Sequence, residues 1–150
     1  NKMPKQQVIE KLEQCWSQLR QSFEGLSIEK MTQPAPDGGW SIKDILAHVR
    51  AWEEECLKYL PMVIAGKRMP RYKDMYGGIN AFNAMTYETN KDLPLDAVLK
   101  NLDDTHERLL DYLRSVPEEF FSSQTRFRRR LVADTYNHYP EHTETIKNIV

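Results

Sequence analysis

Hydrophobic side chains recur every three or four residues along most of the chain, which is the spacing of an amphipathic helix. A first stretch of this kind runs from about Lys5 to Leu26, and a second runs from Ile42 to Leu60. The loop 34–39 between them contains two prolines and two glycines, which break regular structure. Ser41 supplies an N-cap for the second stretch, and Asp44 gives it a capping box. The pattern therefore predicts two long helices joined by a loop.

The remainder of the chain shows the same period with different breaks. After a polar break over 66–78, a shorter helix is expected from Ile79 to about Asn90, and a long one between Pro94 and Pro117. The arginine cluster at 126–130 is expected to be a solvated loop that leads into a last helix, Leu131 to Val150. No stretch alternates in the manner of a strand. We therefore expect an all-α fold, an antiparallel up-and-down four-helix bundle with one short extra helix.

Length and charge narrow the class of protein. A chain of 150 residues is the size of one domain, so we expect residues 1–150 to form a single bundle. The 21 Lys and Arg nearly balance the 22 Asp and Glu, which argues against a dedicated nucleic-acid binder. No apolar run approaches the ~20 residues that cross a bilayer, and no secretory signal is visible. Cys15 and Cys56 lack a CxxC spacing and are expected to be reduced, so we predict a cytoplasmic protein. From the balanced charge and the lack of a membrane-spanning run, we expect neither nucleic-acid nor membrane partners.

Three histidines lie on the inner stripes of two of these helices. His138 and His142 are four residues apart, which places both on one face of a helix, and His48 lies within the second stretch. Facing helices of a bundle can bring three imidazoles to one point. We expect a divalent metal ion there, first of all Zn²⁺ or Ni²⁺, with one coordination position left open. Hydrogen-bonded core histidines are the alternative. Such a spacing also arises by chance, and Pro140 between the two histidines would kink a helix.

Carboxylates, amides and aromatic rings near these histidines are candidates for the rest of a site. Glu141 and Glu53 neighbour the histidines in sequence and are candidate catalytic bases, with a solvated surface position as the alternative for each. The candidate lining of a substrate pocket consists of Trp52, Asn80, Asn83 and Tyr87. The alternative is that the aromatic rings only cover the bundle and that the amides lie at exposed turns.

Several stretches resemble a known family. The stretch from Gly39 to Glu53, GWSIKDILAHVRAWE, resembles the second-helix signature of the DinB/YfiT-like superfamily of four-helix bundles. The stretch HYPEH at 138–142 resembles the HxxxH element of the same superfamily, with a proline that departs from the usual pattern. The stretches 79–88 and 95–110 are similar to its ClbS/DfsB branch.

The two parts of this resemblance imply different mechanisms. The superfamily implies that His48, His138 and His142 bind a metal ion and that a low-molecular-weight thiol is a cosubstrate. Bacillithiol S-transferases and mycothiol-dependent maleylpyruvate isomerase are members of that kind. The ClbS/DfsB branch implies protection from a reactive genotoxin through opening of its cyclopropane ring, without a need for the three histidines.

Three hypotheses follow for the function. The first is a metal-dependent thiol transferase or hydrolase that acts on an electrophilic small molecule in detoxification or stress protection. The second is a metal-free, ClbS-like protein that binds or hydrolyses a reactive metabolite. The third is a non-catalytic bundle that works as a dimer. The sequence does not fix the oligomeric state. Because bundles that resemble this chain often pair through helix faces, we expect a homodimer.

Overall fold

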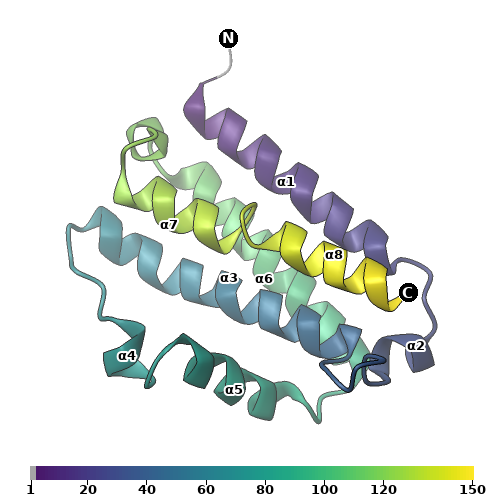
Figure 1. The fold of residues 1–150 in the computed structure, drawn as a ribbon. Helices are drawn as coiled ribbons and strands as arrows, with labels where there is room; N and C mark the ends of the chain where they lie inside the picture. The colour runs from purple at the N-terminus through teal and green to yellow at the C-terminus, as the bar shows by residue number, and fades with distance from the viewer. Residues whose placement is uncertain (1–2) are drawn as a thin grey trace.

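A computed structural model describes residues 3–150, and regular structure within that range is entirely helical (Figure 1). The elements are α1 (Pro4–Phe23), α2 (Ile28–Thr32), α3 (Ile42–Ile64), α4 (Tyr72–Met75), α5 (Ile79–Asn90), α6 (Leu95–Ser115), the 3-10 helix η1 (Glu118–Phe121), α7 (Arg126–Asp134) and α8 (Tyr139–Ile149). The all-α prediction is therefore confirmed, and α5 is the expected short extra helix. Residues 1–2 of the predicted domain lie outside the described residues.

Four long rods form the bundle, namely α1, α3, α6, and α7 followed in line by α8 (Figure 1). Lys43 donates to the backbone carbonyls of Lys91 and Leu93, which sets the first turn of α3 beside the start of α6. Lys5 donates to the carbonyl of Val116, which sets the start of α1 beside the end of α6. Neighbours α1 and α6 are thus antiparallel as expected, whereas α3 and α6 run parallel. The reason is that the chain returns to the start of α3 through α4 and α5 before α6 begins.

The predicted capping box fixes the start of α3. The Ser41 hydroxyl accepts the backbone N–H of Asp44, and the Asp44 carboxylate accepts the backbone N–H of Ser41, both at 3.1 Å. These bonds satisfy donors that the first helical turn leaves without partners. In the helix that begins here, Ile45 and His48 lie on the buried face.

The last rod differs from the single helix that was expected over 131–150. Helix α7 begins earlier, at Arg126, where the hydroxyl of Thr125 caps it, so the arginine cluster is helical and the prediction of a loop was wrong. The helix ends at Asp134, and α8 begins at Tyr139. Pro140 explains the interruption, because within a continuous helix its ring would clash with the carbonyl four residues earlier. In the first turn of α8 its missing N–H costs nothing.

One buried network of charged and polar groups crosses the core. Glu53 of α3 is fully buried, and the Nδ1 atom of His106 on α6 lies 2.8 Å from its carboxylate. The other ring nitrogen of His106 lies 2.8 Å from a carboxylate oxygen of Glu13 on α1, and Trp16 stacks on the ring at 3.7 Å. The hydroxyl of Tyr139 on α8 donates to the same Glu53 carboxylate. Burial opposes the charged form of His106, but hydrogen bonds to Glu53 and Glu13 outweigh it and raise its pKa. The network therefore ties all four rods together.

We predict that His106→Ala destabilises the protein by about 3–5 kcal/mol, because it leaves the buried Glu53 carboxylate without its opposite charge. The free energy of unfolding in urea measures this loss. Arg20→Ala is the control, since the Arg20–Asp103 pair is 41% and 51% exposed and is expected to contribute less than about 1 kcal/mol. Equal losses in the two variants would contradict the role given to the network.

Candidate metal centre

The three histidines picked out from the sequence converge in the folded chain. The Nε2 atoms of His48 and His138 lie 3.2 Å apart, and those of His142 and His138 lie 2.9 Å apart. The nitrogen atoms that the three rings offer as ligands all lie within 4.8 Å of one another. Ring centroids are separated by 5.1, 4.7 and 4.5 Å, so the imidazoles surround one point. The expected convergence is present.

The break between α7 and α8 gives these side chains their positions. His48 projects from the middle of α3, and His142 from the first turns of α8. His138 is the residue before α8 and has φ −108° and ψ −46°, so it approaches from the end of the helix. Tyr139, the next residue, is anchored in the core through Glu53. This anchor holds the start of α8, and with it His138 and His142, against α3.

Burial keeps the three imidazoles neutral. Burial, with the charges of His142 and His138 adding to it, lowers the pKa of His48 to about 3. Burial together with His142 lowers the pKa of His138 to about 4, and burial lowers that of His142 to about 4. A neutral imidazole is the form that ligates a metal ion. The rings are therefore ready to ligate at neutral pH, without first losing a proton.

The donor set fits a divalent cation. Zn–N bonds of about 2.0–2.1 Å at tetrahedral angles put the ligand nitrogens roughly 3.3–3.4 Å apart. The spacings of 3.2 and 2.9 Å around His138 are close to that value. Protons on Nε2 cannot satisfy three nitrogens that face one another, whereas a cation can. The surroundings of the site are less complete at His48, because no described residue accepts a hydrogen bond from its buried Nδ1 atom, whereas the backbone of Asp134 hydrogen-bonds His138.

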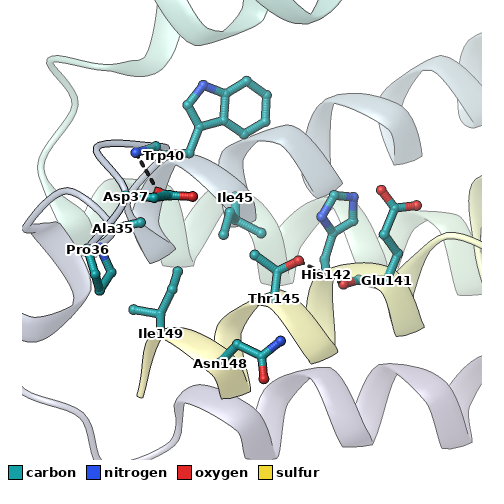
Figure 2. A pocket seen from close by; sticks show the side chains of 11 residues that line it. Ala35, Pro36, Asp37, Trp40, Ile45, Glu141, His142, Thr145, Asn148 and Ile149 are labelled. Atoms are coloured by element: carbon teal, nitrogen blue, oxygen red, sulfur yellow. Dashed lines mark hydrogen bonds between the residues drawn. The ribbon is translucent and has the colours of Figure 1, made fainter.

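Two clefts meet at this point. The histidine cleft, of about 450 Å³, is lined by all three histidines, by Trp40, Trp52, Ile79 and Asn83, and by the 133–134 and 141 positions. The α8 cleft, of about 540 Å³, lies between the loop 35–40, Ile45 of α3 and the exposed side of α8 (Figure 2). Trp40, Glu141 and His142 line both. Molecules in the two clefts would therefore meet at the same imidazole.

Some of the predicted site residues lie at these clefts. Trp52 and Asn83 line the histidine cleft, and the indole N–H of Trp52 donates to the amide oxygen of Asn83 at 2.9 Å. Glu141 is exposed and lines both clefts. The structure thus brings three of the six candidates beside the histidines.

The other three lie elsewhere. Glu53 is fully buried in the core network and lines neither cleft, and its role as a catalytic base stays a prediction. Asn80 is exposed and borders a separate groove with α4. Tyr87 stands behind Trp40, with stacked rings 6.1 Å apart, and lines a small neighbouring cavity.

Sequence reasoning missed Trp40. It is absent from the candidate pocket lining given above, but it lines both clefts and its ring lies 5.2 Å from that of His48. The available signal was its place directly before the Ser41 cap and after Gly38 and Gly39. A hydrophobic residue directly before an N-cap often packs against the fourth residue of the helix, here Ile45, and both residues line the α8 cleft.

Comparison with known proteins decides the family. The DinB superfamily matches residues 11–145, which include all three histidines. The chain belongs to the DinB superfamily. No curated protein sequence matches this DinB-superfamily chain.

Two solved structures share the fold. One is described as "Sibling Lethal Factor Precursor - DfsB", has a TM-score of 0.80 and 18% identity, and the match covers 99% of this chain and 95% of that one. The other is the colibactin self-resistance protein ClbS in complex with a dsDNA, with a TM-score of 0.80 and 13% identity, over 96% and 94% of the two chains. The expected likeness to DfsB and ClbS is thus confirmed for the fold.

The comparison overturns one expectation. Balanced net charge was used to exclude nucleic acid as a partner, but ClbS, a protein of the same fold, has been solved with double-stranded DNA. The exclusion was therefore wrong. A near-zero net charge is a sum over the whole chain and does not describe how charge is distributed on the surface.

As for membranes, none of the helices within 3–150 is both long and apolar enough to span a bilayer.

The lowered pKa values predict that the metal-free DinB protein loses stability in acid. In the unfolded chain the imidazoles titrate near 6.5, whereas in the folded chain they stay neutral until about pH 4. Their stabilising contribution is therefore complete above pH 6.5. As the pH falls below 6.5, the unfolded chain takes up protons that the folded chain does not. The free energy of unfolding of chelator-treated protein should thus decrease by several kcal/mol between pH 6.5 and 4.

The matched control carries His48→Asn, His138→Asn and His142→Asn together and retains His106. This variant should lose much less stability over the same pH range. A decrease as large as that of the unmodified protein would assign the acid sensitivity to other groups.

Proposed function

We propose that the protein binds one divalent metal ion through His48, His138 and His142 and acts on an electrophilic small molecule in the histidine cleft. The observation that carries this proposal is the convergence of three neutral imidazoles on the wall of an open cleft. Zn²⁺ and Ni²⁺ suit a set of three imidazoles best. Such an ion supplies a Lewis acid that polarises a bound group and lowers its pKa. The reaction class is transfer to a thiol or hydrolysis, in detoxification of a reactive compound.

The chain's own residues have separate tasks in this proposal. Trp40 and Trp52 give the cleft two aromatic walls for the apolar part of the molecule. Asn83 is oriented by its bond to Trp52 and keeps its amide N–H groups free to donate. Glu141 is exposed beside His142 and can accept a proton and pass it to water. Glu53 is a positioning residue that acts through Tyr139.

A metal-free reaction is the alternative within the same fold, and one observation favours it. The buried Nδ1 atom of His48 has no acceptor among the described residues, whereas metal-bound histidines usually have one. In this alternative the histidine cleft holds the reactive molecule and the imidazoles contribute polarity only. The two proposals differ in whether metal is required.

Metal analysis separates them. Protein purified without an affinity tag and reloaded with Zn²⁺ or Ni²⁺ is expected to hold one ion per chain, as measured by plasma mass spectrometry after gel filtration. His48→Ala should lower the metal affinity by more than about tenfold, because it removes one of three ligands. Arg20→Ala is the control, since Arg20 forms an exposed pair with Asp103 outside the site and the core network, and this variant should leave the affinity unchanged. Folded protein that takes up no ion would contradict the metal proposal and leave the metal-free one.

Charge segregation favours a second function, contact with duplex DNA. The segments 65–76 and 122–134 hold eight of the 21 Lys and Arg but only two of the 22 Asp and Glu. They carry an excess of six positive charges, and the rest of the chain has an excess of seven negative ones. Arg126 donates to the carbonyl of Lys67 and Arg130 donates to the hydroxyl of Tyr72, so the two segments are packed together. We propose that this basic patch contacts DNA phosphates, as the ClbS complex with dsDNA suggests by analogy.

Charge reversal tests the basic patch. Arg68→Glu with Lys73→Glu changes two exposed cations of the patch and should weaken binding to a duplex of about 20 base pairs by at least about tenfold at low salt. It should also lower the slope of log affinity against log salt. Lys100→Glu on α6 is the control outside the patch, and fluorescence anisotropy is the measurement. Equal weakening by the control, or no binding by the unmodified protein, would contradict the proposal.

A further inference from the structure

The α8 cleft is the larger of the two clefts at the histidines, and the proposed reaction gives it no occupant. Its volume of about 540 Å³ is in the range of small-molecule sites. It opens along the side of α8 and ends at His142 and Glu141, where the histidine cleft begins (Figure 2). A molecule bound in it would lie within reach of the centre rather than at a remote surface.

The walls of the α8 cleft are mostly apolar. Ile45 of α3 lies in the middle of the cleft and is 3% exposed, so it forms the floor. Pro36 and Ile149 face each other at the end farthest from His142 (Figure 2). Trp40 adds the largest apolar surface beside the loop. These surfaces suit an apolar or aromatic body.

The charged groups of the α8 cleft are carboxylates. Asp37 lies at the loop end and Glu141 at the opposite end, and both are exposed (Figure 2). No Lys or Arg is among the described residues that line the cleft. Lys147, the nearest cation along α8, is outside the lining and pairs with Glu144. In the metal-free protein, the charged side chains at both ends of the cleft are therefore carboxylates.

We infer that the α8 cleft binds a small organic ammonium ion, an amine with an apolar or aromatic body, as the ligand next to the histidine centre. The protonated amine is attracted by Asp37 or Glu141, and the indole face of Trp40 favours the same charge. The apolar body lies on Ile45 and Ile149. This inference rests on the proposed function only in giving the ligand a place in the reaction. The binding itself needs no metal.

A pair of probes with similar shape and opposite charge tests the inference. Phenethylammonium and 3-phenylpropionate are titrated into metal-free protein, and ¹⁵N NMR follows the Trp40 indole N–H and the backbone N–H groups of Gly39 and Thr145. Phenethylammonium is expected to shift these signals in a saturable manner, and 3-phenylpropionate at least about fivefold more weakly or not at all. Equal binding of the two probes, or shifts confined to other parts of the chain, would overturn the inference.

Substitutions of single carboxylates test which side chains cause the preference for a cation. Asp37→Asn and Glu141→Gln are each expected to weaken phenethylammonium binding about threefold, and Glu141→Lys to reverse the preference between the probes. Asp37→Asn retains an oxygen that can accept the N–H of Gly39, so the loop is preserved. Glu144→Gln, an exposed carboxylate of α8 outside the lining, is the matched control and should change nothing. If it weakens binding as much as Asp37→Asn, the attraction is a general property of the surface and the site is refuted.

Binding of phenethylammonium in the α8 cleft does not depend on the metal proposal. Binding is repeated in His48→Ala, a histidine that does not line the α8 cleft. Unchanged phenethylammonium binding in this variant is expected even if the protein takes up no metal. Conversely, a protein that binds Zn²⁺ but not phenethylammonium refutes the inference and leaves the metal proposal standing.

Discussion

The buried carboxylate of Glu53 is the constraint on which the candidate site depends. It lies against the ring of His106 on α6 and accepts the hydroxyl of Tyr139 on α8, and through His106 it is connected to Glu13 on α1. A charge without contact with water must keep its partners, so these helices cannot shift independently. Tyr139 follows directly after His138 and precedes His142 by three residues. The same bond that stabilises the core therefore fixes the two C-terminal histidines opposite His48.

The chemistry at that point follows from burial and charge. Burial keeps the imidazoles neutral, which makes their nitrogens free to ligate a cation. The two clefts that meet there have different linings. The histidine cleft is lined by aromatic rings and an amide, and the α8 cleft by apolar surface between two carboxylates. Positive charge is gathered instead around the α3–α4 connection and α7. Small molecules and a polyanion would thus be bound by different parts of one bundle.

Much of the fold could be predicted from the sequence, because periodicity and caps are local properties. The helix from Ile42, its Ser41 cap and the short helix from Ile79 were all visible in the sequence. The division at residues 135–138 was not predicted, because Pro140 is compatible with a kinked helix as well as with the first turn of a new one. The parallel course of α3 and α6 was also out of reach, since it depends on how α4 and α5 lead the chain back.

For the site, the sequence predicted the three histidines and several of their neighbours. It did not predict which side chains are buried and which line a cleft. Glu53 and Glu141 look alike in the sequence, yet one is fully buried and the other lines two clefts. Trp40 was absent from the predicted lining because an aromatic side chain before a helix start has no periodic signature of its own. The charge pattern was visible in the sequence, but summing it over the chain concealed the basic patch.

X-ray absorption spectroscopy of the metal-loaded protein tests the central claim most directly, because it reports the atoms bound to the ion. The account predicts a first shell with three imidazole nitrogens at about 2.0–2.1 Å from Zn²⁺ and an oxygen ligand such as water at the remaining position. The multiple-scattering signal of histidine should fall by one third in His48→Ala. A shell of carboxylate or water oxygens without imidazole, or one containing sulfur from Cys15 or Cys56, would contradict it.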